Sequence, residues 1–95
     1  MDPIEPRLQA VEKQLADLEA RLAELEHVSA TGGEAAANEA REALPEIRER
    51  LRTTRAKLDR LRSEQAQAWE REDLLAGIEA ILDEVGRRIT RILGL

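Results

Sequence analysis

The chain of 95 residues contains no cysteine, no phenylalanine and no tyrosine, and it has one tryptophan, one methionine and one histidine. The absence of cysteine excludes a disulfide framework and thiolate chemistry within these residues. A compact globular core without Phe or Tyr is unusual, because aromatic side chains account for much of the burial in such cores. The composition therefore points toward long helices, whose cores are built from Leu, Ile, Val and Ala.

Long hydrophobic runs are also absent. The apolar stretches extend over only a few residues each, which is too short to span a bilayer. The first residues, "MDPIEPRLQA", lack the apolar core of a secretory signal. Together with the lack of cysteine, which suits a reducing compartment, this predicts a soluble cytoplasmic protein.

No catalytic motif is present. The sequence has neither a G-x-x-x-x-G-K-[ST] loop nor a G-x-S-x-G elbow. His27 has no second His and no Cys with which to bind a metal ion. The carboxylates lie at helical spacing on solvated faces, where no pocket would perturb their pKa values. We therefore expect no enzymatic activity, no cofactor and no metal.

Charged residues make up 37% of the chain and hydrophobic residues 42%, and the hydrophobic residues recur with helical spacing. We predict a first helix over about residues 3–28, with Asp2 as its N-cap, and a turn over 29–33 at Gly32-Gly33. A second helix is predicted over about 34–65, with Pro45 on its outer side as a kink or a restart. In each helix the residues spaced alternately three and four apart form a seam, the stripe expected to face the other helix. The first seam is Leu8, Val11, Leu15, Leu18, Leu22 and Leu25, and the second is Ala37, Ala40, Leu44, Ile47, Leu51, Thr54, Leu58 and Leu61.

Opposite charges flank these two seams at heptad spacing. Folding the chain back at Gly32-Gly33 brings the acidic flank of the first helix against the basic flank of the second, as in an antiparallel coiled coil. A register slipped by one heptad keeps most of these pairs but leaves the two glycines off the apex. The sequence thus predicts an antiparallel coiled-coil hairpin over residues 1–65. The expected pairs are Glu26 with Arg41, Glu19 with Arg48, Glu12 with Arg55, and Glu5 with Arg62.

Residues 66–95 form a C-terminal amphipathic helix with the widest apolar face in the chain. If the second helix runs on without a break, this segment projects beyond the first helix. Burying it against a second copy then gives a helical-bundle homodimer or a higher oligomer. If the chain instead turns at about Glu70–Asp73, the segment lies along the hairpin as a third helix. We favour self-association, with an interface of Trp69, Leu74, Leu75, Ile78, Ile81, Leu82, Val85, Ile89, Ile92 and Leu93.

Trp69 is the only aromatic residue and lies at the junction of the two parts. Tryptophan is enriched among the residues that dominate binding interfaces, so Trp69 is a candidate recognition anchor. A packing role at the junction accounts for its position equally well.

Two basic stretches suggest other functions. In "IRERLRTTRAKLDRLR" the outward cations are Arg50, Arg52, Lys57 and Arg60, which are candidate nucleic-acid contacts. Acidic neighbours dilute this charge, and no Phe or Tyr is available for base stacking. The C-terminal "DEVGRRITRILGL" resembles a membrane-surface helix, but residues 72–95 are net acidic, which favours subunit packing.

The expected fold is therefore all-α: an antiparallel helical hairpin with a C-terminal extension, assembled into a bundle. The expected function is that of a non-enzymatic interaction protein, such as a scaffold, adaptor, chaperone or inhibitor. Its expected partners are a second copy of itself and another protein. Nucleic-acid binding and peripheral membrane binding are the alternatives.

Overall fold

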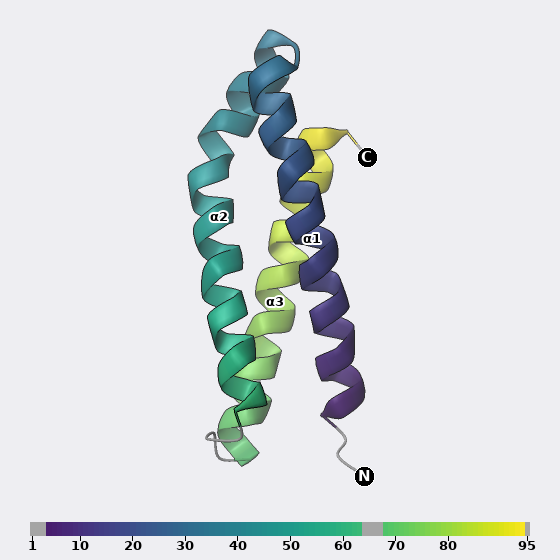
Figure 1. The fold of residues 1–95 in the computed structure, drawn as a ribbon, viewed down its shortest axis with the longest axis vertical. Helices are drawn as coiled ribbons and strands as arrows, with labels where there is room; N and C mark the ends of the chain where they lie inside the picture. The colour runs from purple at the N-terminus through teal and green to yellow at the C-terminus, as the bar shows by residue number, and fades with distance from the viewer. Residues whose placement is uncertain (1–3, 64–67, 95) are drawn as a thin grey trace.

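The protein is built from three α-helices and no strands over the residues that the computed structural model describes, which are 4–63 and 68–94. The helices are α1 (Glu5–Thr31), α2 (Glu34–Arg62) and α3 (Ala68–Leu93) (Figure 1). The expectation of an all-helical fold is confirmed.

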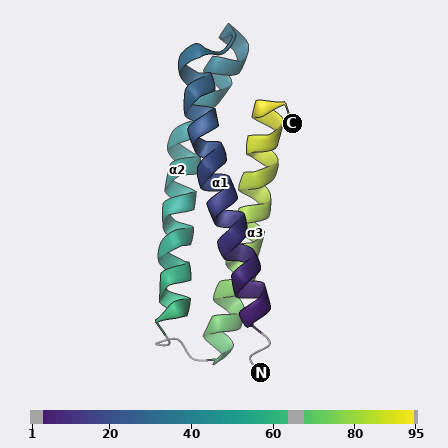
Figure 2. The same cartoon turned by 45° about the vertical axis from the view of Figure 1, so that its right-hand side comes forward.

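The three helices lie side by side in an elongated bundle measuring 49 × 20 × 16 Å. α2 runs antiparallel to α1, and α3 turns back along α2 and so runs parallel to α1 (Figures 1 and 2). Of the two arrangements considered for residues 66–95, the one in which the second helix runs on without a break and projects beyond the first is wrong. α2 ends at Arg62, where the Ser63 N–H donates to the Asp59 carbonyl over 3.0 Å, and α3 packs against both other helices.

α1 is longer than the sequence indicated and ends at Thr31, and two hydroxyls of its last turn bond to carbonyls of the same helix. The Ser29 hydroxyl donates to the Glu26 carbonyl over 2.7 Å, and the Thr31 hydroxyl donates to the His27 carbonyl over 2.9 Å. The predicted turn over 29–33 therefore shrinks to Gly32 and Gly33. Gly32 suits this corner because a Cβ there would lie 2.7 Å from the Val28 carbonyl oxygen. The predicted N-cap, Asp2, lies outside the described residues.

α2 continues through Pro45, whose side chain is exposed. Proline lacks the N–H that would bond the preceding turn, and placing the ring on the solvent side limits the disruption. The buried polar residue of this helix, Thr54, donates its hydroxyl to the Arg50 carbonyl over 2.7 Å, so no polar group is left unsatisfied there.

One hydrophobic core runs between the three helices. The seam residues predicted for α1 and α2 are buried, except that Leu22 is partly exposed. The apolar residues of α3 complete the core rather than forming an external interface, so the proposed oligomer stripe is already covered within one chain. Leu75, Ile78, Leu82, Val85, Ile89 and Ile92 are buried, and Leu74, Ile81 and Leu93 pack partly buried against the core.

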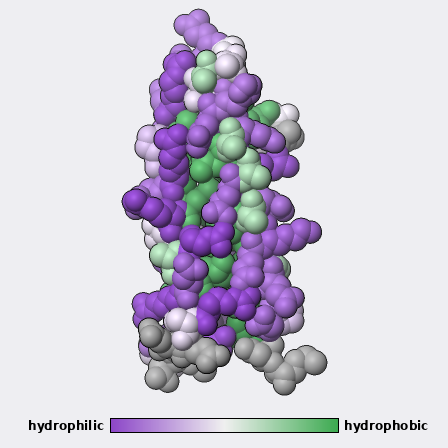
Figure 3. Space-filling view, in the orientation of Figure 1, coloured by the Kyte–Doolittle hydropathy of each residue, from purple (hydrophilic) through white to green (hydrophobic). Residues whose placement is uncertain are grey.

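Hydrophilic side chains cover most of the outer surface. On the face drawn in Figure 3, hydrophobic residues show mainly in the grooves between the helices. Trp69 is the exception among the described residues, since it is a large hydrophobic residue exposed at 69%.

Candidate binding site

Trp69 lies in the first turn of α3, at the end of the bundle where α2 ends. An exposed indole carries an unfavourable hydration cost, which a partner or a ligand would remove. Of the two roles considered for Trp69, its exposure argues against that of a buried packing plug.

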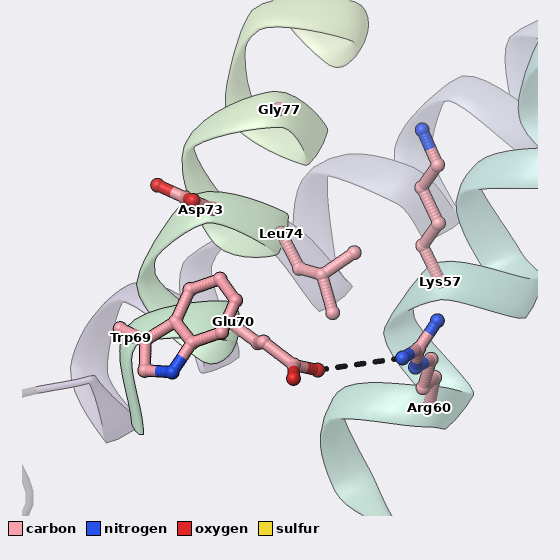
Figure 4. Close-up of a pocket in the computed structure, with 7 residues that line it drawn as sticks. All are labelled: Lys57, Arg60, Trp69, Glu70, Asp73, Leu74 and Gly77. Atoms are coloured by element: carbon pink, nitrogen blue, oxygen red, sulfur yellow. Dashed lines mark hydrogen bonds and ion pairs between the residues drawn. The ribbon is translucent and has the colours of Figure 1, made fainter. Parts of the chain in front are cut away.

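A cavity of about 250 Å³ opens beside Trp69 between α2 and α3. Figure 4 shows Leu74 extending from α3 toward α2 and Glu70 reaching across to Arg60. The Arg60 Nη2 and the Glu70 Oε2 lie 3.4 Å apart, and this ion pair joins the two walls. The lining residues are Lys57 and Arg60 of α2 and Trp69, Glu70, Asp73, Leu74 and Gly77 of α3.

The charges around this cavity balance, since two cations face two carboxylates. Lys57 has no ion pair among the residues that the structure describes, so its ammonium group is available to pair with an acidic residue of a partner. Gly77 keeps the α3 wall open, because a Cβ built there meets nothing within 4 Å. At about 250 Å³ the cavity is smaller than the roughly 300–1,000 Å³ typical of small-molecule sites. Its size and its mixed lining suit a side chain of a partner protein better than a substrate.

The four candidate nucleic-acid residues are mostly engaged within the protein. Arg50 lies 3.0 Å from Glu46 and 2.7 Å from Glu84 of α3, and Arg52 pairs with Glu49. Arg60 and Lys57 both line the Trp69 cavity. Arg50, Arg52 and Arg60 therefore neutralise neighbouring carboxylates, and the four residues do not present a continuous basic face.

The charge pairs between α1 and α2 are largely offset by one heptad from the predicted set. Of the expected pairs, Arg62–Glu5 is present at 3.3 Å. Arg62 also pairs with Glu12, which raises the pKa of its guanidinium. The predicted partner of Glu26 was Arg41, which instead donates to the Ser29 carbonyl over 3.0 Å and to Asn38 over 2.8 Å. The offset pairs are Arg48 with Glu26 (3.6 Å), Arg55 with Glu19, and Arg62 with Glu12.

Further ion pairs fix α3 to both other helices, and the sequence analysis missed them. Arg7 of α1 lies 2.7 Å from Glu72 and 2.6 Å from Glu79, and the hydrogen bonds that it donates to Glu79 and Glu72 raise its pKa. The hydrogen bond from Arg7 lowers the pKa of Glu79. On the other side, Arg88 lies 2.8 Å from Glu46 of α2 and lowers its pKa. The seven-residue spacing of Glu72 and Glu79 is the signal that could have revealed this contact.

Neither a metal site nor a membrane span is found in the part of the chain that the structure describes. No group of three or more His, Cys, Asp or Glu residues is placed there to hold a metal ion. No helix in the same part is both long and apolar enough to cross a bilayer. His27 is exposed near the end of α1.

Comparison of the chain with protein-family models, with curated proteins and with solved structures finds no match in any of the three.

Proposed function

We propose that the protein is a non-enzymatic helical interaction module that binds a segment of a partner protein at the Trp69 cavity. An adaptor or a scaffold works in this way, with a rigid helical body presenting one docking surface. The observation that carries the proposal is the exposure of Trp69 at 69%, beside a cavity between two helices.

The lining residues define the partner. An apolar side chain of the bound segment inserts between Trp69 and Leu74, and an acidic residue next to it pairs with Lys57. Tryptophan dominates many protein interfaces because its large ring buries much area at little entropic cost. The packing of α2 against α3 in the common core sets the separation of the two walls, and the Arg60–Glu70 ion pair bridges them, so the cavity is formed before the partner arrives.

The body behind this site is proposed to include an antiparallel coiled-coil hairpin of α1 and α2. The 3-4 spacing of their buried residues and the Glu–Arg pairs along one flank support this. The earlier argument for a homodimer rested on a free apolar stripe on α3, and that stripe is inside the core. Support for nucleic-acid binding is similarly reduced, because Arg50, Arg52 and Arg60 all have carboxylate partners.

The test uses Trp69 as its own reporter, because the chain has no other tryptophan and no tyrosine. Peptides are selected from a random library on the immobilised protein, and their affinities are measured for wild type, Trp69→Ala and the control Arg52→Ala. We expect Trp69→Ala to weaken binding by about 30-fold or more, as for an interface hot spot of ~2 kcal/mol, and Arg52→Ala to leave it unchanged.

Bound peptides should also shift the tryptophan emission of the wild type to shorter wavelength as water leaves the indole. Peptides that bind Trp69→Ala as tightly as wild type would refute the proposal. A selection that yields no ligand dependent on Trp69 counts against it in the same way.

A further inference from the structure

Three arginines without an ion pair among the described residues line one groove of this protein. Most described arginines are ion-paired, and Arg41 donates to a carbonyl and an amide oxygen. Arg21, Arg87 and Arg91 have no ion pair to any residue within 4–63 or 68–94. Arg87 makes one long bond of 3.4 Å from its Nε to the Asp83 carbonyl. The ion-paired arginines are Arg7, Arg48, Arg50, Arg52, Arg55, Arg60, Arg62 and Arg88.

All three of these arginines line a groove of about 410 Å³ between α1 and α3. Arg87 and Arg91 are one helical turn apart and so project from the same side of α3. Arg21 faces them from α1. The remaining lining residues are Gln14 and Leu18 of α1 and Leu82, Asp83, Gly86 and Thr90 of α3.

The floor of the groove is fixed by packing. Leu18 and Leu82 are buried, and a Cβ at Gly86 would lie 3.6 Å from the Leu18 Cδ2, so the helices approach closely here. Because Gly86 has no side chain, no Cβ stands above the α3 backbone at this position of the groove. The groove is basic, since three arginines outnumber the one carboxylate, Asp83, to which the Gln14 amide donates over 3.4 Å, and it also offers the hydroxyl of Thr90.

We propose that this groove binds a terminal phosphate group. A guanidinium donates two parallel hydrogen bonds to a phosphate, and such charge-assisted bonds are among the strongest in proteins. A dianionic phosphate between Arg21 and the Arg87–Arg91 pair supplies the negative charge that these arginines lack within the described chain. The group is carried either by a phosphorylated side chain or by a small molecule.

Long polyanions fit this surface poorly. Asp17 and Glu24 flank Arg21 in an adjoining hollow, and the chain has a net charge of −5. A nucleic acid that ran past the groove along α1 would meet this negative charge. It would also find no aromatic residue for stacking, because Trp69 lies eighteen positions before Arg87, about 27 Å along α3.

A second copy of the chain is also a poor occupant. Its carboxylates could pair with the arginines, but exposed ion pairs contribute only about 0.2–1 kcal/mol each. Association costs roughly 4–15 kcal/mol before any gain. No large hydrophobic residue is exposed at this groove to make up the difference, since Trp69 lies near the other end of α3.

The test measures binding of inorganic pyrophosphate, and of an acidic peptide with and without one phosphoserine, by calorimetry at about 50 and 200 mM salt. The variants are Arg87→Gln with Arg91→Gln and, as a control, Arg48→Gln with Arg52→Gln, which changes the net charge equally. We expect the first pair to weaken binding of the phosphorylated probes at least about tenfold and the control pair to change it little. Circular dichroism checks that both double variants stay helical.

Tighter binding of the phosphopeptide than of pyrophosphate identifies a phosphorylated polypeptide as the source, and the reverse identifies a small molecule. Equal losses in the two double variants would show that only net charge matters and would overturn the proposal. Equal affinity for the phosphorylated and unphosphorylated peptides, with no pyrophosphate binding, would overturn it as well. Because Trp69 is not involved, Trp69→Ala should leave phosphate binding unchanged, which separates this site from the Trp69 cavity.

Discussion

Replacing Gly77 by alanine should stabilise the protein, although glycine at this position lines the Trp69 cavity. Gly77 lies within α3, where glycine loses more backbone entropy on folding than alanine does. A Cβ at Gly77 meets nothing within 4 Å, so alanine introduces no clash. The expected gain in the free energy of unfolding is about 0.5–1 kcal/mol.

The other glycines provide matched comparisons for the same substitution. At Gly86 the new Cβ would lie 3.6 Å from the Leu18 Cδ2, an ordinary contact, so Gly86→Ala should stabilise at least as much as Gly77→Ala. At Gly32 it would lie 2.7 Å from the Val28 carbonyl oxygen, which is backbone and cannot move away easily. Gly32→Ala should therefore destabilise by about 1–3 kcal/mol.

Urea denaturation followed by circular dichroism measures the free energy of unfolding of all three variants. In thermal denaturation of a domain of this size, ~1 kcal/mol corresponds to a shift of about 4–8 °C in Tm. The reasoning would be refuted if Gly77→Ala and Gly86→Ala destabilised the protein, because α3 would then not be a continuous helix with these packing environments. If Gly77→Ala stabilises the fold but weakens ligands that depend on Trp69, the glycine keeps the cavity open at a cost in stability.

Two further predictions test the charge pairs. Glu19→Arg should destabilise the protein by about 0.2–1 kcal/mol. Adding Arg55→Glu should restore the lost stability, whereas adding Arg48→Glu should not. Full rescue by Arg48→Glu in urea denaturation would favour the register expected from the sequence. Arg7→Gln should lower the stability of the bundle near neutral pH, and this difference from wild type should disappear in acid. The sign follows from the pKa of Glu79, which Arg7 holds below the ordinary 4.5 in the folded protein. The contribution of the Arg7–Glu79 pair to stability is complete above pH 4.5 and is lost as the pH falls through the lower pKa of Glu79 in the folded protein. A difference from wild type that persisted in strong acid would contradict this prediction.

The hydrophobic seams of α1 and α2 could be predicted because a 3-4 spacing has one structural interpretation over this length. The exact charge register could not. Glutamates and arginines that each repeat every seven residues satisfy one another in two registers one heptad apart, and Arg62 contacts both Glu5 and Glu12. The choice depended on the turn, and α1 continues to Thr31, beyond the residue where composition suggested an end.

The candidate site was predicted in part. Trp69 and Leu74 were named from the sequence as interface residues, while Lys57 and Arg60 were assigned to a different surface. Their meeting in one cavity depends on the connection between α2 and α3, and no Gly or Pro stands between Arg62 and Ala68 to mark it in the sequence. The groove of Arg21, Arg87 and Arg91 was hidden for the same reason, because only the return of α3 brings it beside α1.

The apolar stripe of α3 can be buried in two ways, and the difference in their free-energy cost explains why α3 turns back along the bundle. Docking it onto a second copy costs roughly 4–15 kcal/mol in lost translational and rotational freedom. Docking it onto α1 and α2 of its own chain costs the closure of the short connection between Arg62 and Ala68, and closure entropy grows only slowly with loop length. Arg7, Arg50 and Arg88 then add ion pairs to α3 from both sides. A wide apolar stripe with acidic residues at heptad spacing therefore favours an intrachain third helix wherever the chain can turn.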